Sequence, residues 1–286
     1  MTPLPVVATV REAYAFAWQH LGAVIGLIWV PMLVLTISGF FAKQRFYNDL
    51  IEALSSGNGA NLGPSMLMML GYVVAALLFY AMMIAAVTQL ALGQRSGPVV
   101  AHFAFGAPEW RTFRALAGLL GLALLILMTA VMAVSALLAM AGGGKTGPQD
   151  GMALVLVLYG LIIAGAPRFL LLLPAVAVAE SEPALRRTWS LSAGHFWRLL
   201  AVLVLTFVPP LTLLVVVETL LAGPMAALDA SGDKMLIVSS VMRARQVLPL
   251  SSGLGFLVAP LLVALFSGAS VSVWRAIKEK APALTE

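Results

Sequence analysis

The sequence contains no cysteine and has few charged residues. Of its 286 residues, 10% are charged and 61% are hydrophobic. The absence of cysteine excludes disulfide scaffolds, thiol nucleophiles and thiolate metal sites. Because about a quarter of the residues in soluble domains are charged, the composition also excludes a soluble globular enzyme of ordinary type. A mean hydropathy of +1.00 predicts that lipid surrounds most of the protein surface.

The sequence also contains only three histidines, which limits the metal and catalytic sites that it can form. His20, His102 and His195 have no second histidine or carboxylate at ligand spacing, and a zinc site needs three or four donors. The motifs H-E-x-x-H and G-x-S-x-G do not occur. We therefore expect no metal, no cofactor and no enzymatic activity. We also expect no nucleic-acid binding, because no basic face with interleaved aromatic residues lies outside the predicted spans.

Long apolar runs dominate the rest of the chain. A helix needs about 20 residues, at 1.5 Å per residue, to cross a hydrocarbon core of about 30 Å. Six runs are this long: Leu21–Ala42, Met66–Leu92, Ala115–Ala141, Met152–Ala179, Phe196–Leu221 and Leu250–Trp274. We predict an all-α fold, a single membrane domain over residues 1–286 with six transmembrane helices.

The basic residues between the spans predict the orientation. One side carries Arg11, Arg95, Arg111, Arg114, Arg186, Arg187, Arg198, Arg275, Lys278 and Lys280. The other side carries Lys43, Arg45, Lys145, Lys234, Arg243 and Arg245. Because cytoplasmic loops are enriched in lysine and arginine, we predict that both termini lie in the cytoplasm. The positive charge also predicts attraction to anionic lipid headgroups.

Short amphipathic segments precede the first, third and fifth spans. Their apolar residues share a spacing of four, three and four: Val10, Tyr14, Ala17 and Leu21; Val99, Phe103, Gly106 and Trp110; Leu185, Trp189, Ser192 and Phe196. This spacing puts each set on one stripe of a helix, which is typical of helices lying in the membrane interface. The pattern indicates a threefold repeat of two-helix units, although any amphipathic helix leading into a span shows similar spacing.

Arg168 and Glu218 are charged residues within predicted spans. Charge inside a membrane faces a cavity or a partner, so both are candidates for an intramembrane polar site. Their predicted depths differ by about 13 Å, which disfavours a direct pair. Arg168 either contacts a ligand or lipid phosphate, or holds backbone carbonyls freed near Pro167 and Pro174.

Prolines and small residues predict how the spans pack. A proline inside a span frees a backbone carbonyl that neighbouring helices or water must satisfy. The prolines in question are Pro31, Pro167, Pro174, Pro209, Pro210 and Pro260. Gly22 with Gly26, and the patch from Ser267 to Ser270, predict close helix packing.

One stretch resembles a known family. It contains Arg168-Phe169-Leu170, Pro174-Ala175-Val176, Glu180, Ala184-Leu185-Arg186-Arg187-Thr188-Trp189 and Gly194-His195-Phe196-Trp197-Arg198. This order resembles bacterial six-span proteins similar to the membrane domain of some glycerophosphoryl diester phosphodiesterases. The match covers about 31 residues, with Thr188 in place of the usual serine and no phosphodiesterase domain in the chain. The resemblance implies a six-span fold in a bacterial cytoplasmic membrane and no specific activity.

Glu180 is predicted to act as an interfacial clasp. It follows the fourth span and precedes the helix beginning near Pro183, where a carboxylate is favourable. Arg186, Arg187 or Arg198 is its expected partner, which would link the fourth span, the interfacial helix and the fifth span. The candidate clasp or headgroup contacts are Glu180, Arg186, Arg187, Trp189, His195, Trp197 and Arg198.

Two functions agree with these features. The first is a non-enzymatic integral membrane protein that binds anionic lipid and organises the membrane, a protein partner or a second copy of itself. The second is a small transporter or channel subunit with a polar path near Arg168 and Glu218. A membrane-embedded enzyme ranks third, because no nucleophile and base occur in a recognisable pattern.

Overall fold

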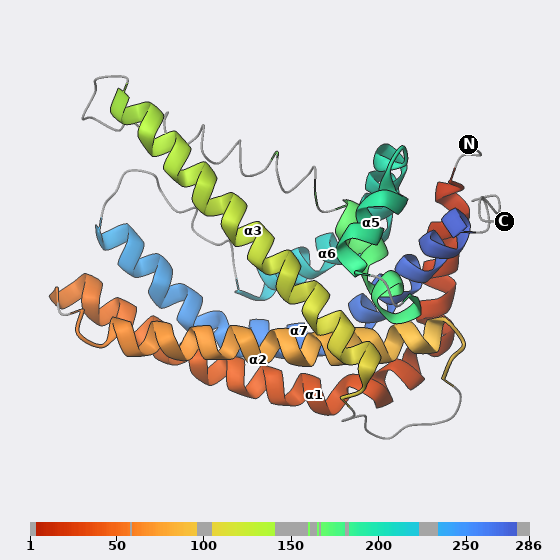
Figure 1. Ribbon diagram of the computed structural model, residues 1–286. Helices are drawn as coiled ribbons and strands as arrows, with labels where there is room; N and C mark the ends of the chain where they lie inside the picture. Colours follow the sequence, from red (N-terminus) through yellow and green to blue (C-terminus); the bar gives the residue numbers. More distant parts are fainter. Residues whose placement is uncertain are drawn as a thin grey trace.

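The computed structural model describes residues 4–57, 59–95, 105–140, 160, 165, 167–180, 183–222 and 234–278. Within these ranges, helices are the only regular secondary structure (Figure 1). The labelled helices are α1 (Val6–Ser56), α2 (Leu62–Ala91), α3 (Ala107–Met140), α5 (Ala184–Ser192), α6 (Phe196–Ala222) and α7 (Lys234–Lys278). A shorter apolar helix, Pro167–Ala179, precedes α5.

Five of the helices, α1, α2, α3, α6 and α7, are long and apolar enough to cross a membrane. The prediction of an all-helical protein with several spans is thereby confirmed, and the helices indicate a multi-pass membrane protein. The predicted fourth span, Met152–Ala179, lies partly outside the described residues. Its described helix, Pro167–Ala179, is shorter than the roughly 20 residues that a crossing requires. A sixth span is therefore not established.

The predicted interfacial helices are not three equivalent elements. Among the described parts of these segments, only α5 is a separate short helix. Gly194, with φ of 79°, lies in the turn between α5 and α6. The first predicted segment is continuous with its span in α1, which Figure 1 shows bending near its beginning. Part of the second, including Val99 and Phe103, lies outside the described residues. The threefold repeat is not confirmed.

Two helices extend beyond the predicted spans at the opposite end. The residues around Phe46 continue α1 beyond the first predicted span, and Met235–Arg245 belong to the same helix, α7, as the last predicted span. No residue that breaks a helix separates Phe46 from the first span. In α7, Pro249 lies inside the helix, where the loss of one backbone hydrogen bond bends a helix more readily than it ends one.

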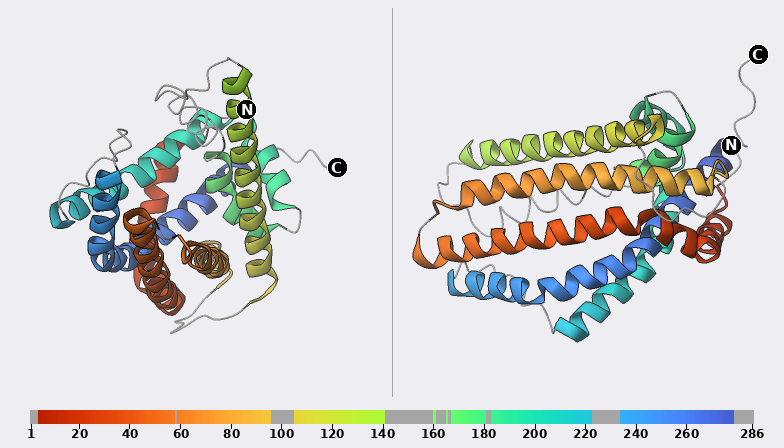
Figure 2. Two further views of the ribbon diagram at one scale, coloured as in Figure 1. Left: turned by 90° about the vertical axis from the view of Figure 1, so that its left-hand side faces the viewer. Right: turned by 90° about the horizontal axis from the view of Figure 1, so that it is seen from below.

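Helices α1, α2 and α7 pack together around the main core. Val24 and Ile28 of α1, Met83 and Val87 of α2, and Leu265 of α7 belong to one buried cluster. Figure 2 shows α1 and α2 running side by side along most of their length. Since these helices contact one another along their spans, they form the framework that positions the other elements.

A second core brings the two ends of the described chain together. Leu4, near the start of the chain, belongs to a buried cluster with Leu172, Leu199 and Val273, and the partly buried Val10 packs against this cluster. The start of α1, the short helix Pro167–Ala179, the start of α6 and the end of α7 therefore lie at one end of the bundle. We call this end the clasp end.

The outer surface of the bundle is apolar. Leu67, Leu213 and Leu257 are 70%, 65% and 72% exposed, and they lie on three different candidate spans. A soluble protein rarely exposes so many large apolar side chains in contiguous patches. This surface suits contact with lipid.

Side chains of neighbouring helices satisfy backbone groups near two of the prolines. Pro210 has no N–H to donate to the Thr206 carbonyl one turn earlier, and the Tyr14 hydroxyl donates to that carbonyl at 2.9 Å. Beside Pro174, the Ala175 N–H donates to the buried Ser270 Oγ at 3.0 Å. These bonds tie α1 to α6 and the short helix to α7, as expected in lipid.

Small residues allow α1 and α7 to approach closely at one point. A Cβ added at Gly268 would lie 2.9 Å from Phe16 Cδ1 and 3.3 Å from the Ala13 carbonyl oxygen. The predicted close packing of the patch from Ser267 to Ser270 therefore holds at Gly268. A Cβ added at Gly22 would meet nothing within 4 Å, so the close packing predicted at Gly22 is wrong.

Gly268→Ala should lower the free energy of unfolding by about 1 to 3 kcal/mol, the usual effect of overpacking a core. The backbone carbonyl of Ala13 has little freedom to move away from the added methyl group. Gly22→Ala is the matched control and should be neutral or slightly stabilising, because alanine favours helix. Thermal unfolding of both variants in detergent checks this, and equal stabilities would contradict it.

Candidate functional site

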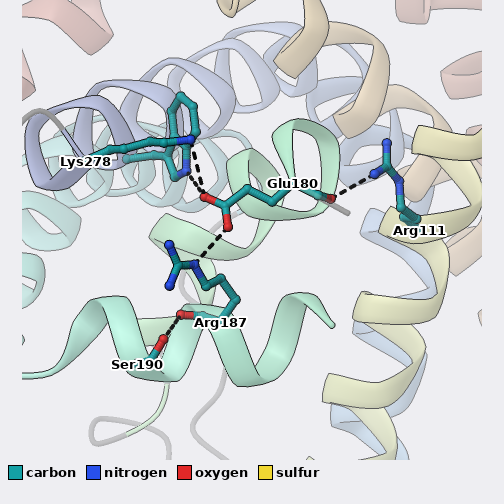
Figure 3. Close-up of polar contacts among 6 residues, drawn as sticks. Arg111, Glu180, Arg187, Ser190 and Lys278 are labelled. Carbon is teal, nitrogen blue, oxygen red and sulfur yellow. Dashed lines mark hydrogen bonds and ion pairs between the residues drawn. The ribbon is translucent and has the colours of Figure 1, made fainter. Parts of the chain in front are cut away.

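Glu180 lies at the centre of a polar cluster at the clasp end. It follows the short helix Pro167–Ala179, and its side chain is only 11% exposed. Its Oε2 accepts a hydrogen bond from Arg187 Nε at 2.9 Å, and its Oε1 accepts one from Trp274 Nε1 at 3.0 Å. Lys278 Nζ lies 4.0 Å from Oε1. Figure 3 shows the side chains of Arg187 and Lys278 converging on the Glu180 carboxylate.

The backbone of Glu180 adds a link to α3. Arg111 donates from Nη1 to the Glu180 carbonyl at 2.8 Å and from Nη2 to the Val178 carbonyl at 3.4 Å. The last carbonyls of a helix lack partners within the helix, and a cation there also interacts favourably with the helix dipole. We call Arg111, Glu180, Arg187, Trp274 and Lys278 the Glu180 clasp.

The clasp joins more of the chain than the sequence predicts. Arg187 is the arginine that pairs with Glu180, whereas neither Arg186 nor Arg198 forms an ion pair with it among the described residues. The predicted link to the fifth span is replaced by links to α3 and α7. Sequence reasoning missed Trp274 and Arg111, which lie 94 and 69 positions from Glu180, because no local pattern connects residues so far apart.

Arg168 contacts aromatic rings. Its guanidinium carbon lies 4.3 Å from the centre of the Trp189 ring and 5.5 Å from that of Phe196. The neighbouring Phe169 also stacks on Trp189, with ring centres 5.9 Å apart. Cation–π contact is worth about 0.5 to 2 kcal/mol, more where water is excluded. Arg168 therefore helps to hold α5 and the start of α6 against the short helix.

Glu218 lies elsewhere in the bundle. It lines a cavity between α1, α2, α6 and α7, and Arg168 is not among the residues that line it. The structure therefore does not bring the two predicted intramembrane charges into one polar site.

Beside the clasp lies a small basic pocket of about 340 Å³. Its lining residues are Arg111, Arg114, Ala115, Ala177, Pro183, Ala184 and Leu185. Arg114 is exposed, and Arg111 Nε is buried with no hydrogen-bond partner among the described residues. A buried donor without a partner is energetically costly.

The remaining predicted contacts lie on α5 and at the beginning of α6. Trp189 and Trp197 are 53% and 77% exposed, and Arg186 is exposed as well. His195 and Arg198 are half-buried. Exposed tryptophan and arginine side chains suit the membrane interface, where an apolar ring or stem and a polar group meet lipid and water together.

Glu109 is a buried carboxylate that sequence reasoning missed. It is 3% exposed in the first turn of α3, and its Oε2 accepts a hydrogen bond from the Gly106 N–H at 3.0 Å. Its Oε1 accepts a longer one from Gln89 Nε2 at 3.5 Å. An acidic residue in the first turn of a helix is the sequence signal that identifies this role. Glu109 thereby joins the end of α2 to the start of α3.

Searches against protein-family models, curated proteins and solved structures find no match to this chain. The resemblance of residues 168–198 to the phosphodiesterase membrane domain therefore stays a prediction from sequence. In the part of the chain that the structure describes, no three histidine, aspartate or glutamate side chains gather in a group that would hold a metal ion. The polar groups of the clasp and the basic pocket are suited to binding and to holding helices together.

Adjacent arginines offer a test of the clasp. Glu180→Gln should lower the free energy of unfolding by about 1 to 3 kcal/mol, because it weakens charge-assisted hydrogen bonds to a nearly buried carboxylate. Arg187→Ala should destabilise less, because its side chain is 38% exposed and water screens the pair. Arg186→Ala should change stability by less than about 0.5 kcal/mol. Thermal unfolding in detergent measures all three, and equal effects at positions 186 and 187 would argue against the clasp.

Proposed function

We propose that this protein is a non-enzymatic integral membrane protein that binds anionic lipid headgroups at its clasp end. The observation that carries the proposal is the basic pocket, which is lined by Arg111 and by the exposed Arg114. Arg111 Nε is buried and has no hydrogen-bond partner among the described residues. Arginine presents several N–H donors in a planar fork that matches the oxygens of a phosphate.

The surroundings of the basic pocket favour a lipid as the source of that phosphate. Ala115, Ala177 and Leu185 give it apolar walls, which suit the first carbons of an acyl chain. Arg186 is exposed nearby on α5, and Lys278 is 55% exposed at the end of α7. Each basic residue near an anionic surface adds about 1 kcal/mol of attraction.

A bound headgroup would act on the arrangement of the helices. The basic pocket is formed by α3, the short helix Pro167–Ala179 and the start of α5, which the Glu180 clasp also joins. An anion there neutralises arginines that otherwise repel one another. In this proposal the lipid stabilises the clasp end, and the protein organises the lipid around it. A protein partner or a second copy of the chain is the alternative occupant of the surface at the clasp end.

The transporter alternative has weaker support. It requires a polar path near Arg168 and Glu218, and these residues contact different parts of the bundle. Flux of a solute in proteoliposomes that Arg168→Ala abolishes would favour the transporter over the lipid-binding protein.

Lipid-dependent stability tests the proposal. Phosphatidylglycerol added to the detergent-purified protein should raise its melting temperature more than phosphatidylcholine does, because a ligand stabilises the state that binds it. Arg114→Ala should remove at least half of that difference. Arg11→Ala, which changes an exposed arginine on α1 outside the basic pocket, is the matched control and should retain it. Indifference of the wild-type protein to lipid charge, or an equal loss in both variants, would overturn the proposal.

The proposal also places the clasp end at the cytoplasmic face of a bacterial inner membrane, since basic residues favour that side. Alkaline phosphatase fused after Glu286 should then be inactive in a bacterial host, because the enzyme needs the oxidising periplasm to form its disulfides. A fluorescent protein that folds in the cytoplasm should be bright at the same position. An active phosphatase fusion would reverse the orientation.

A further inference from the structure

A larger cavity lies in the bundle away from the clasp end. It has a volume of about 400 Å³ and is lined by residues of α1, α2, α6 and α7. Helix α6 begins at the clasp end with Phe196, and Glu218 follows after about 33 Å of helix at 1.5 Å per residue. The cavity therefore lies well away from the basic pocket, and we call it the Lys43–Glu218 cavity.

Two opposite charges line the Lys43–Glu218 cavity without pairing. Lys43 of α1 and Glu218 of α6 are both half-buried, and neither forms an ion pair or hydrogen bond with another described residue. Charged side chains within membrane spans usually pair with each other or face a functional cavity, because their desolvation is costly. A ligand carrying both signs of charge would compensate both residues at once.

Hydroxyl groups surround the same space. Tyr72 and Tyr80 of α2 and Ser252 of α7 line the cavity, and none of them hydrogen bonds to another described residue. The Thr36 hydroxyl donates to the Met32 carbonyl at 2.8 Å, so its oxygen still has lone pairs to accept with. These groups supply both donors and acceptors to a polar headgroup.

Most of the remaining wall is apolar, and one of the lining residues of α2 is exposed at the protein surface. Leu35 and Phe40 of α1, Leu214 of α6 and Phe256 of α7 line the cavity, and Tyr80 is 40% exposed at its edge. A few polar groups set among apolar walls are typical of a small-molecule site. The combination suits an amphiphile whose headgroup enters the bundle while its chains stay in the bilayer.

We propose that the Lys43–Glu218 cavity binds the phosphoethanolamine headgroup of an aminophospholipid. The Glu218 carboxylate accepts hydrogen bonds from the lipid's primary ammonium group, and the Lys43 ammonium donates to its phosphate. A purely anionic headgroup would place its charge near Glu218 without a partner for that carboxylate. A choline headgroup has no N–H to donate to Glu218. This inference concerns different residues from the anionic-lipid proposal and does not rest on it.

A graded series of lipids tests the proposal on the wild-type protein alone. Phosphatidylethanolamine, its N-monomethyl and N,N-dimethyl derivatives and phosphatidylcholine lose the ammonium N–H donors one at a time. Native mass spectrometry of the full chain in detergent should show affinity falling along the series, by about tenfold from first to last, because charge-assisted hydrogen bonds are lost. Equal affinity for the four lipids would overturn the proposal, whatever the variants do.

Two nearly isosteric variants assign the selectivity to this cavity. Glu218→Gln should weaken the preference for phosphatidylethanolamine over phosphatidylcholine, because the amide oxygen still accepts a hydrogen bond but without the charge of the carboxylate. Lys43→Met should weaken binding of both lipids together. Arg45→Met is the matched control for Lys43, because its side chain is 59% exposed two positions further along α1 and does not line the cavity. Retention of the full preference in Glu218→Gln would contradict the proposal.

Two further measurements complete the test. One distinguishes the Lys43–Glu218 cavity from the basic pocket, and the other distinguishes a lipid from a soluble ligand. Arg114→Ala should leave the preference for phosphatidylethanolamine unchanged, so failure at the basic pocket and failure at this cavity are distinguishable. Free phosphoethanolamine should bind at least tenfold more weakly than the lipid, because it lacks chains to pack against the apolar wall. Equal binding of the soluble compound would overturn the lipid as the source of the headgroup.

Discussion

In a membrane, charged and backbone polar groups must find their partners inside the protein, because the lipid core offers none. This constraint is consistent with hydrogen bonds between residues that lie far apart in the sequence. Glu180 collects an arginine, a tryptophan and a lysine from two helices, while Arg111 occupies the carbonyls beside it. The same requirement brings the Tyr14 hydroxyl to the carbonyl that Pro210 leaves without a donor.

These polar contacts determine how the helices are arranged more than whether the helices form. Apolar side chains contact lipid on the outside of the bundle and one another on the inside. Because both surroundings are apolar, burial alone does little to favour one arrangement of the helices over another. A hydrogen-bonded carboxylate permits far fewer arrangements of the helices than apolar contacts do, because its donors must lie at defined positions. The Glu180 carboxylate therefore restricts how α5 and α7 meet, and Arg111 joins α3 to the Glu180 backbone carbonyl. The basic pocket is formed where α3, the short helix and α5 come together.

The chain separates its polar groups into two regions that suit different ligands. At the clasp end, arginines predominate around a pocket with an apolar wall, which favours an anion. In the Lys43–Glu218 cavity the two signs of charge are balanced and hydroxyls are added, which favours a ligand that carries both signs. This difference in electrostatic composition is the reason that we propose different headgroups for the two regions.

Composition and hydropathy alone determined that the protein is helical and embedded in lipid, because long apolar runs have few other stable forms. Local pattern also placed Glu180 among arginines, and Arg187 lies within seven positions of it. Only the tertiary structure decided which charges meet. Trp274 reaches Glu180 across 94 positions, Glu218 shares a cavity with Lys43, and Arg168 lies on aromatic rings. Helical periodicity shows which residues share one face of a span. It does not show which neighbouring helix packs against that face, because the apolar surfaces of the helices are nearly alike.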